Sequence, residues 1–233
     1  LWGGTKSRGR DFSGGWKCFS QKRHWNSCFN TKKNRKHEKG TAVIRLGVLG
    51  STKGTDLVPI VGAIKKGELN ASVEVVISNN RGSLILEKAK KYSIDHFFID
   101  HRSKTREDFD KEISNRLKEK EVGLVLLIGF MRILSKGFVS DWEGKIINVH
   151  PSLLPKYAGG MNEGVHQQVL DAKDKETGCT IHLVTTKVDE GSILVQKKCV
   201  VGPEDTIGSL KKKVQKLEGE AFIEAIRDWG KNE

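Results

Sequence analysis

Short apolar runs and amphipathic stretches alternate along the chain from residue 41 onward, and this alternation predicts its fold. Three apolar runs of strand length cover Val43–Leu49, Val73–Ile77 and Asp95–Ile99. Stretches with the period of an amphipathic helix follow them, from Leu57, over Ser83–Tyr92, and from Thr105 to about Lys120. Thr105 and Asp108 have the spacing of a helix capping box. Strands that alternate with helices are typical of βαβ units, so we predict a mainly parallel sheet.

The run Val122–Ile128 is almost unbroken in apolar residues, which is typical of a central strand that is covered on both faces. The link Lys187–Gly191 predicts a hairpin that carries Asp189 on its tip. The pattern therefore predicts an α/β fold, with a single domain over residues 41–233 and a mainly parallel twisted sheet flanked by helices. The remaining predicted elements are a strand at 146–149, a helix over Val165–Ala172, strands over Cys179–Thr185 and Ser192–Val200, and a helix over Thr206–Trp229.

Three segments that follow predicted strands mark the candidate site: Gly50–Asp56, Gly129–Leu134 and Asn148–His150. Because ligands of parallel sheets bind at the carboxyl ends of the strands, we expect one crevice to collect all three. The first segment is a glycine-bearing turn before a helix, a geometry that binds phosphate through backbone N–H groups and the helix dipole. Its spacing is neither GxGxxG nor that of a P-loop, and an N-cap role for Thr55 or Asp56 is an equally good interpretation.

The stretch Lys145–Gly160, KIINVHPSLLPKYAGG, contains the strongest candidate chemistry. Asn148 and His150 lie two residues apart at the end of a predicted strand, so their side chains point to the same face. Pro151 and Pro155 then stop the strand pairing. A carboxamide and an imidazole that project together suit acyl-type chemistry. The alternative is that Asn148 starts a turn and that backbone groups satisfy His150.

Charge separates residues 1–40 from the rest of the chain. The whole chain has a net charge of +12, and this tail holds eleven Lys or Arg against Asp11 and Glu38. The tail has no hydrophobic period, so we expect it to be disordered. Three interpretations compete: a peptide that targets an organelle, a basic arm for nucleic acid, and, since the chain opens with Leu rather than Met, an extension foreign to the working protein.

The four cysteines are far apart and form no CxxC pair, so they indicate neither a zinc site nor a disulfide framework. We therefore expect no metal and a reducing compartment, the cytoplasm. No apolar run approaches the roughly 18 residues that cross a bilayer, so we expect no membrane association.

The segment INVHPSLLPKY at 147–157 resembles the glycinamide ribonucleotide formyltransferases of purine synthesis, as do GFMRILS at Gly129–Ser135 before it and VDEG at 188–191 after it. The resemblance covers about Ile44 to the end of the chain. It implies a formyltransferase-like Rossmann-type topology and transfer of a formyl group from 10-formyltetrahydrofolate to the amine of glycinamide ribonucleotide in purine (IMP) biosynthesis.

Two other functions stay open beside this one, and we expect a monomer or a homodimer. The first is another 10-formyltetrahydrofolate-dependent formyltransferase, with an amino-sugar or methionyl-tRNA acceptor. The second is a nucleic-acid-binding protein that acts through its basic arm, although no motif in the arm supports nucleic acid as a partner.

Carried over residue by residue, the resemblance implies a catalytic trio of Asn148, His150 and Asp189. Asn148 and a protonated His150 would donate hydrogen bonds to the developing oxyanion. Asp189 would hold His150 as imidazolium and help to move the proton from the attacking amine to the departing folate nitrogen. The resemblance also implies binding residues, Gly54, Thr55, Asp56, Gln215 and Glu218 for the phosphoribosyl and glycinamide groups, and Arg106, Phe130, Met131, Arg132, Ile133 and Leu134 for the folate.

Two departures from the family pattern concern the phosphoribosyl group. The family has Asn where this chain has Asp56, and a carboxylate beside a phosphate is repulsive unless backbone amides and the helix dipole outweigh it. The segment AGGMNEGVH is about three residues longer than its family counterpart and keeps only His166 of two closely spaced histidines. The resemblance therefore does not predict how this loop closes over the substrate.

Overall fold

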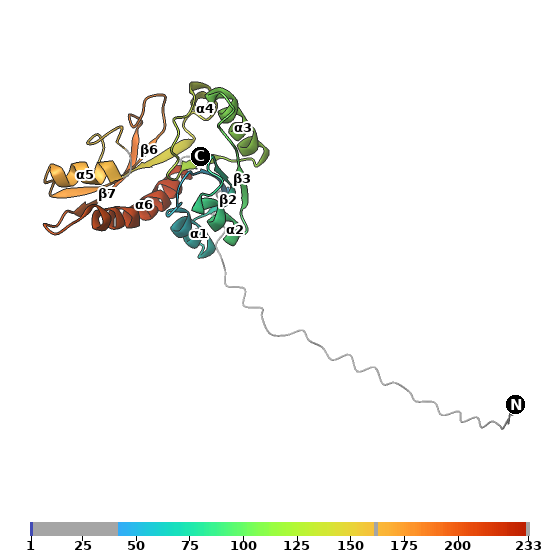
Figure 1. Cartoon of the computed structure of the whole chain (residues 1–233), viewed down its shortest axis with the longest axis horizontal. Coiled ribbons are helices and arrows are strands. Elements are labelled where there is room, and N and C mark those ends of the chain that lie inside the picture. The colour runs from blue at the N-terminus through green and yellow to red at the C-terminus, as the bar shows by residue number, and fades with distance from the viewer. Residues whose placement is uncertain (2–41, 161–162, 232–233) are drawn as a thin grey trace. The chain divides into compact units, whose positions relative to one another are not determined.

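Strand β1 (Ile44–Leu49) lies inside a seven-stranded sheet with the order β3-β2-β1-β4-β5-β6-β7 (Figure 1). The computed structural model describes residues 1, 42–160 and 163–231. β1 runs parallel to four other strands, which are β2 (Ala71–Ser78), β3 (Asp95–Phe98), β4 (Leu124–Leu127) and β5 (Ile146–His150). The prediction of an α/β fold with a mainly parallel sheet is confirmed. The predicted tail lies outside the described residues, apart from Leu1.

The last two strands, β6 (Glu176–Leu183) and β7 (Ile193–Val200), run antiparallel to their neighbours. The predicted hairpin is therefore confirmed, but its connection is longer than the sequence predicts. Residues 184–192 separate the two strands, because the pairing ends at Leu183 and a register shift after Ile181 already loosens it. This longer connection lets the residues around Asp189 fold back over the sheet end.

Helices cover both faces of the sheet. α1 (Leu57–Lys65), α2 (Leu84–Lys91) and α6 (Ile207–Trp229) pack on one face. α3 (Arg106–Glu119) and α4 (Lys136–Asp141) pack on the other, on the opposite side of the sheet in Figure 1. α5 (Glu163–Asp171) lies against α6. The central strands β1 and β4 are mostly apolar on both faces because both of their faces are buried in this way.

Polar caps set several of these helix starts. Thr105 accepts a hydrogen bond from the Asp108 backbone N–H, as the predicted capping pattern requires. Thr206 and Ser209 form a reciprocal capping box at the start of α6. The sequence pattern did not predict α4, because six residues are too short to show a helical period. No helix within the described ranges combines the length and the apolar character that crossing a membrane requires.

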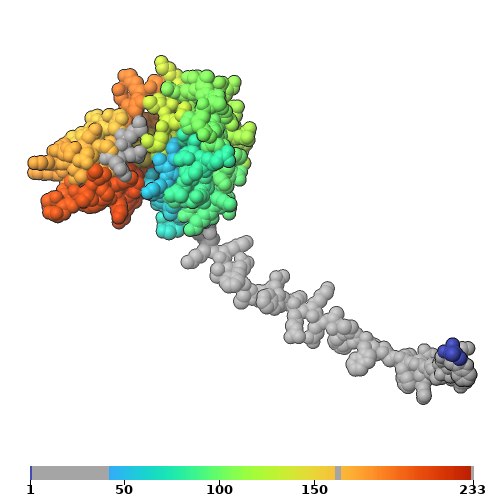
Figure 2. All heavy atoms as spheres, in the orientation of Figure 1, coloured from blue at the N-terminus to red at the C-terminus, as the bar shows by residue number. Residues whose placement is uncertain are grey.

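The strand order reverses between β1 and β4, and this is the point where ligands of such sheets bind. β1 leads into β2 on one side, while β4 lies on its other side. The turns after these two strands touch, because the Ser51 backbone N–H donates to the Gly129 carbonyl over 3.0 Å. In the space-filling view the red surface of α6 adjoins the blue surface of the β1–α1 region (Figure 2), which agrees with the packing of α1 against α6. The fold thus brings α6 and the ends of β1, β4 and β5 toward one edge.

Candidate active site

His150 ends β5 with both ring nitrogens facing acceptors. Its side chain is only 3% exposed. Nδ1 lies 3.2 Å from Oδ2 of Asp189, and Nε2 lies 3.0 Å from the Tyr157 carbonyl oxygen. A neutral imidazole has one N–H and could satisfy only one of these acceptors, whereas the imidazolium donates to both. The geometry therefore favours the protonated ring that the resemblance implies.

Asp189 lies in the connection between β6 and β7, and donors surround its carboxylate. The Gly159 backbone N–H donates to Oδ2 over 2.9 Å, and His182 Nε2 lies 3.5 Å from Oδ1. Burial alone would raise the pKa of this carboxyl, but hydrogen bonds from His150 and the Gly159 N–H, with the His182 ring beside it, outweigh burial and hold the pKa well below its usual range. The residue also has a φ of +57°, a strained conformation that Asp tolerates better than most residues. The surrounding contacts therefore hold an ionised carboxylate on the imidazole.

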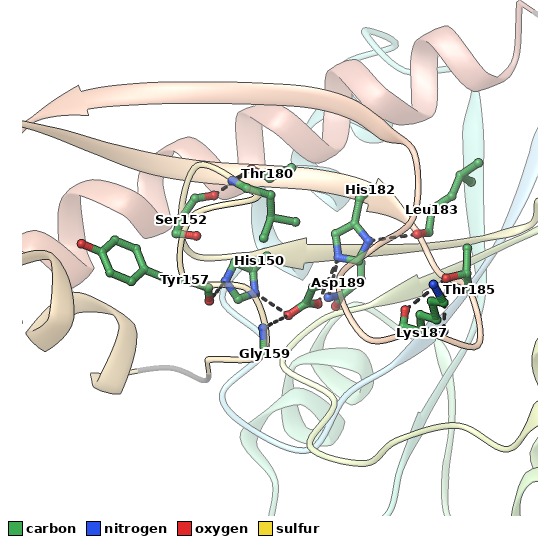
Figure 3. A network of polar contacts seen from close by, with 12 residues as sticks. His150, Ser152, Tyr157, Gly159, Thr180, His182, Leu183, Thr185, Lys187 and Asp189 are labelled. Carbon is green, nitrogen blue, oxygen red and sulfur yellow. Dashed lines mark hydrogen bonds and ion pairs between the residues drawn. The ribbon is translucent and has the colours of Figure 1, made fainter.

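Asn148 lies on the same face of β5, and its side chain reaches a residue that the sequence did not predict. Its Nδ2 lies 3.1 Å from Nε2 of His182, which stands directly opposite on β6. His182 Nδ1 donates to the Leu183 carbonyl over 2.9 Å, so a neutral His182 can accept the Asn148 N–H at Nε2. Figure 3 shows His150 and His182 on either side of Asp189, both pointing toward its carboxylate. The structure thus brings together the three residues that the resemblance implies as catalytic, and His182 lies against two of them.

A cavity of about 390 Å³ opens beside this network. The loop after β4 forms one wall and includes all five residues implied for the folate slot, Phe130, Met131, Arg132, Ile133 and Leu134. Asn148, His150, His182 and Asp189 line the same cavity. Apolar walls with a few convergent polar groups are typical of a small-molecule site. Ser51 holds the loop in place, since its Oγ accepts the Met131 backbone N–H over 2.9 Å and donates to Asn79 Oδ1 over 2.6 Å.

The glycine turn after β1 forms a second group at this edge. Gly54 has a φ of +57°, and a Cβ there would lie 2.3 Å from Cγ1 of Ile85, so only glycine fits. The Lys88 ammonium group donates to the Lys53 and Gly54 carbonyls and places a positive charge beside the turn. Asp56 occupies the N-cap position of α1, but its side chain makes no capping hydrogen bond. Asp56 thus has the N-cap position that the sequence allowed for, without a capping hydrogen bond from its side chain.

The other implied substrate residues fall into different places. Glu218 on α6 is buried, and the charge of Asp56 acts to raise its pKa. Gln215 lies on α6 one turn earlier and is half-buried. Arg106 is exposed at the first residue of α3 and does not belong to the lining of the cavity. Its role toward the folate stays a prediction.

Residues 44–226 match the family model described as "Formyl transferase". The chain is 37% identical over 183 residues to "Phosphoribosylglycinamide formyltransferase" of Escherichia coli K12, which covers 78% of this chain and 84% of that protein. It is 40% identical over 185 residues to "Trifunctional purine biosynthetic protein adenosine-3" of Drosophila melanogaster, which covers 78% of this chain but only 14% of that protein. The chain thus spans a small part of the trifunctional relatives and most of the bacterial one.

Solved structures show the same likeness. The fold superposes on glycinamide ribonucleotide transformylase 1 from Symbiobacterium toebii with a TM-score of 0.78 and 34% identity, over 82% of this chain and 89% of that one. It superposes on phosphoribosylglycinamide formyltransferase from Coxiella burnetii with a TM-score of 0.76 and 36% identity, over 81% and 88% of the two chains.

Proposed function

The chain belongs to the formyl transferase family, and from this premise we propose that it transfers a formyl group from 10-formyltetrahydrofolate to the amine of glycinamide ribonucleotide, a step of purine biosynthesis. The observation that carries the proposal is the position of His150. Its ring is held between the Asp189 carboxylate and the Tyr157 carbonyl, beside Asn148 and at the wall of an apolar cavity. The bacterial relatives that match most of this chain carry the name of this activity.

The reaction begins when the amine nitrogen of the acceptor attacks the formyl carbon. A C–N bond forms, and the electron pair of the carbonyl moves onto oxygen as an oxyanion. His150 as imidazolium and an N–H of Asn148 donate hydrogen bonds to this oxygen. Asn148 Nδ2 gives one N–H to His182, and its second N–H is the one that we assign to the formyl oxygen. Such donors are effective because they point at the developing charge before the reaction starts.

The second half of the reaction moves a proton and breaks a bond. The attacking nitrogen loses a proton to Asp189, directly or through a water molecule, and Asp189 passes this proton to the folate nitrogen as the bond between that nitrogen and the formyl carbon breaks. The electron pair of the oxyanion then re-forms the carbonyl on the acceptor. Protons and charge balance without a nucleophilic residue, and the residues that we name suffice for this chemistry.

Tyr157 adds a step to this mechanism. Its carbonyl accepts the Nε2–H of His150 over 3.0 Å, so the N–H meant for the oxyanion is occupied in this structure. Tyr157 itself has a φ of +64°, which a non-glycine residue adopts only under strain. We infer that the formyl oxygen displaces the Tyr157 carbonyl from His150 when the substrates bind.

The substrates occupy the two groups of residues at the sheet edge. The pterin of the folate lies in the cavity against Phe130–Leu134, and its glutamate tail extends toward Arg106. The phosphate of the acceptor lies on the turn of Gly54 and Thr55 at the N-terminus of α1, where backbone N–H groups and the helix dipole favour an anion. Gln215 and Glu218 on α6 contact its glycinamide and ribose. The partners are therefore small molecules, and the protein works as a monomer or a homodimer.

Product release by the full-length chain tests the proposal. The purified protein is mixed with glycinamide ribonucleotide and 10-formyltetrahydrofolate, and tetrahydrofolate formation is followed by absorbance. We expect turnover by the wild-type chain and a loss of several powers of ten in Asn148→Ala. Binding of the folate without turnover on this amine would contradict the proposed acceptor and leave the formyl donor standing.

A further inference from the structure

Asp56 is a buried carboxyl that the mechanism above does not use. It is 4% exposed at the N-cap position of α1, and its side chain makes no capping hydrogen bond. Its Oδ1 is fully buried and has no hydrogen-bond partner within the described residues. Among the described residues, no Lys, Arg or His nitrogen lies within 4.0 Å of the carboxyl oxygens of Asp56. An ionised carboxylate is very unfavourable in such a place.

A second carboxyl lies on the helix that packs against this point. Glu218 of α6 is 8% exposed and directly precedes Gly219. A Cβ on Gly219 would lie only 2.5 Å from Cγ of Pro59, so α6 approaches the first turn of α1 as closely as a glycine allows. This close approach brings Glu218 toward Asp56, and the negative charge of Asp56 opposes ionisation of Glu218.

Few groups near the pair compensate for its charge. Lys88 from α2 faces Asp56, but its ammonium group is bonded to the Lys53 and Gly54 carbonyls. Cys179 from β6 faces both carboxyls as an uncharged thiol, and Lys53 and Lys211 act from greater distance on Lys88 and Glu218. Burial therefore dominates and raises the pKa of Asp56 to about 7, against the attraction of Lys88. Burial, followed by the charge of Asp56, raises the pKa of Glu218 to about 8.

We propose that Asp56 is a proton-linked specificity residue, and that the chain binds the phosphate of its acceptor only when the Asp56 carboxyl is protonated. The inference rests on the proposed function, because it takes the phosphate to lie on the adjoining Gly54–Thr55 turn. A neutral carboxylic acid has an O–H that can donate, and it carries no charge that would repel the phosphate. The N-terminus of α1 attracts the phosphate through its helix dipole. An ionised Asp56 would place a negative charge there and oppose this attraction.

The proposal makes acceptor binding weaken as the pH rises. Above a pH of about 7 the free protein loses the Asp56 proton, so binding must take it up again. Proton linkage then raises the dissociation constant toward tenfold for each pH unit. The phosphate does not contribute over this range, because a phosphate monoester has its second pKa near 6 and is already a dianion.

Calorimetric titration of the full-length chain with glycinamide ribonucleotide tests this. The dissociation constant is measured at several pH values between about 6.5 and 9, for the wild type, Asp56→Asn and the control Asp141→Asn. Asp141 is an exposed carboxylate that pairs with Lys118, so its variant changes the net charge equally. The amine of the acceptor titrates in this range but does so alike with all three proteins. Titrations at about pH 8 in two buffers of different ionisation enthalpy give the number of protons taken up.

We expect the wild type and Asp141→Asn to take up about one proton more on binding than Asp56→Asn does. As the pH rises, the affinity of these two proteins for the acceptor should fall by up to tenfold per pH unit relative to Asp56→Asn. Parallel pH curves for the wild type and Asp56→Asn would overturn the role of Asp56 and leave the proposed reaction intact. If Asp56→Asn fails to fold, Asp56→Ala replaces it as the uncharged variant, and parallel pH curves for Asp56→Ala and the wild type overturn the proposal. No binding by any of the three proteins would overturn both this inference and the proposed acceptor.

Discussion

Asp189 and Asp56 are two buried carboxyls at the same edge of one sheet, and their electrostatics are opposite. The Asp189 side chain is 9% exposed in a half-buried residue, and Asp56 is 4% exposed, so burial opposes ionisation of both carboxyls. The pKa of Asp189 lies well below its usual range, whereas that of Asp56 is raised to about 7. The difference lies in their partners. Asp189 receives hydrogen bonds from a backbone N–H and has two imidazoles beside it, while Asp56 keeps an oxygen with no partner in the described structure.

This comparison separates two uses of a buried acid. Where donors are fixed in advance, burial strengthens the interaction and stabilises the charge that catalysis needs. Where too few donors reach the carboxyl, burial outweighs them and raises its pKa into the physiological range. The catalytic network thus has a charge pattern that is stable around neutral pH. The turn after β1 has one that changes with pH.

The largest expected effect comes from removing the residue that Asp189 holds. His150→Ala should lower kcat by three powers of ten or more, because it deletes the charged donor to the oxyanion. Its circular dichroism spectrum should stay close to that of the wild type. His96→Ala is the matched control, since His96 is exposed on β3 and bonds only to the Ile94 carbonyl within the described chain. A near-normal rate in His150→Ala would exclude the proposed mechanism.

Asp189→Asn should have the next largest effect, a loss of a hundredfold or more in kcat. The amide keeps the shape of the side chain but removes the negative charge that stabilises the imidazolium. Stability should change as well. A carboxyl whose pKa is lowered on folding stabilises the protein above its unfolded pKa of about 3.9, and this contribution is lost as the pH falls through the folded pKa. Urea unfolding should therefore show a deficit in the variant near pH 7 that shrinks toward pH 3. A deficit of equal size at both values would assign the effect to packing instead of charge.

The hydrophobic pattern predicts most of this fold because the sheet is buried on both faces. β1 is predicted at Val43–Leu49 and found at Ile44–Leu49, and the run Val122–Ile128 contains the central strand β4. The pattern fails where elements are short or irregular. α4 is missed at six residues, and the link between β6 and β7 is longer than predicted, because a register shift and not a turn signal ends the pairing.

The candidate site is predicted to the extent that its residues share one strand. Asn148 and His150 lie on one face by the period of a strand, and that much needs no structure. Their partner His182 lies 34 residues after Asn148, and the contact depends on the antiparallel register of β5 with β6. The signal for His182 in the sequence is a histidine inside the predicted strand Cys179–Thr185. The pairing of Asp56 with Glu218 depends in the same way on helix packing, which no local pattern encodes.

Asp56→Asn should stabilise the protein, whereas Asp189→Asn should destabilise it. The pKa of Asp56 is raised on folding, so the wild-type carboxyl costs stability increasingly as the pH rises from about 4 to about 7. The variant escapes this cost. We expect it to gain roughly 4 kcal/mol in free energy of unfolding near pH 8 and little near pH 4, since the pKa is raised by about three units and each unit corresponds to roughly 1.4 kcal/mol. Urea unfolding at both pH values checks this, with Asp141→Asn as the exposed control. Equal stability of Asp56→Asn and wild type near pH 8 would mean that Asp56 is compensated in the native protein.

The smallest expected effect concerns the residue that joins the two regions. Ser51 follows β1 on the turn that leads to Asp56, and its hydroxyl accepts the Met131 backbone N–H from the loop that walls the cavity. Ser51→Ala removes this acceptor and the hydrogen bond to Asn79, at a cost of about 1 to 2 kcal/mol in the position of the loop. We expect KM for the formyl donor to rise about tenfold with kcat changed less, because the loop binds the folate and makes no contact with the reacting atoms. Steady-state kinetics with Ser140→Ala as the exposed control measures this. An unchanged KM would mean that the loop keeps its shape without Ser51, and that the two regions are coupled only through the substrates.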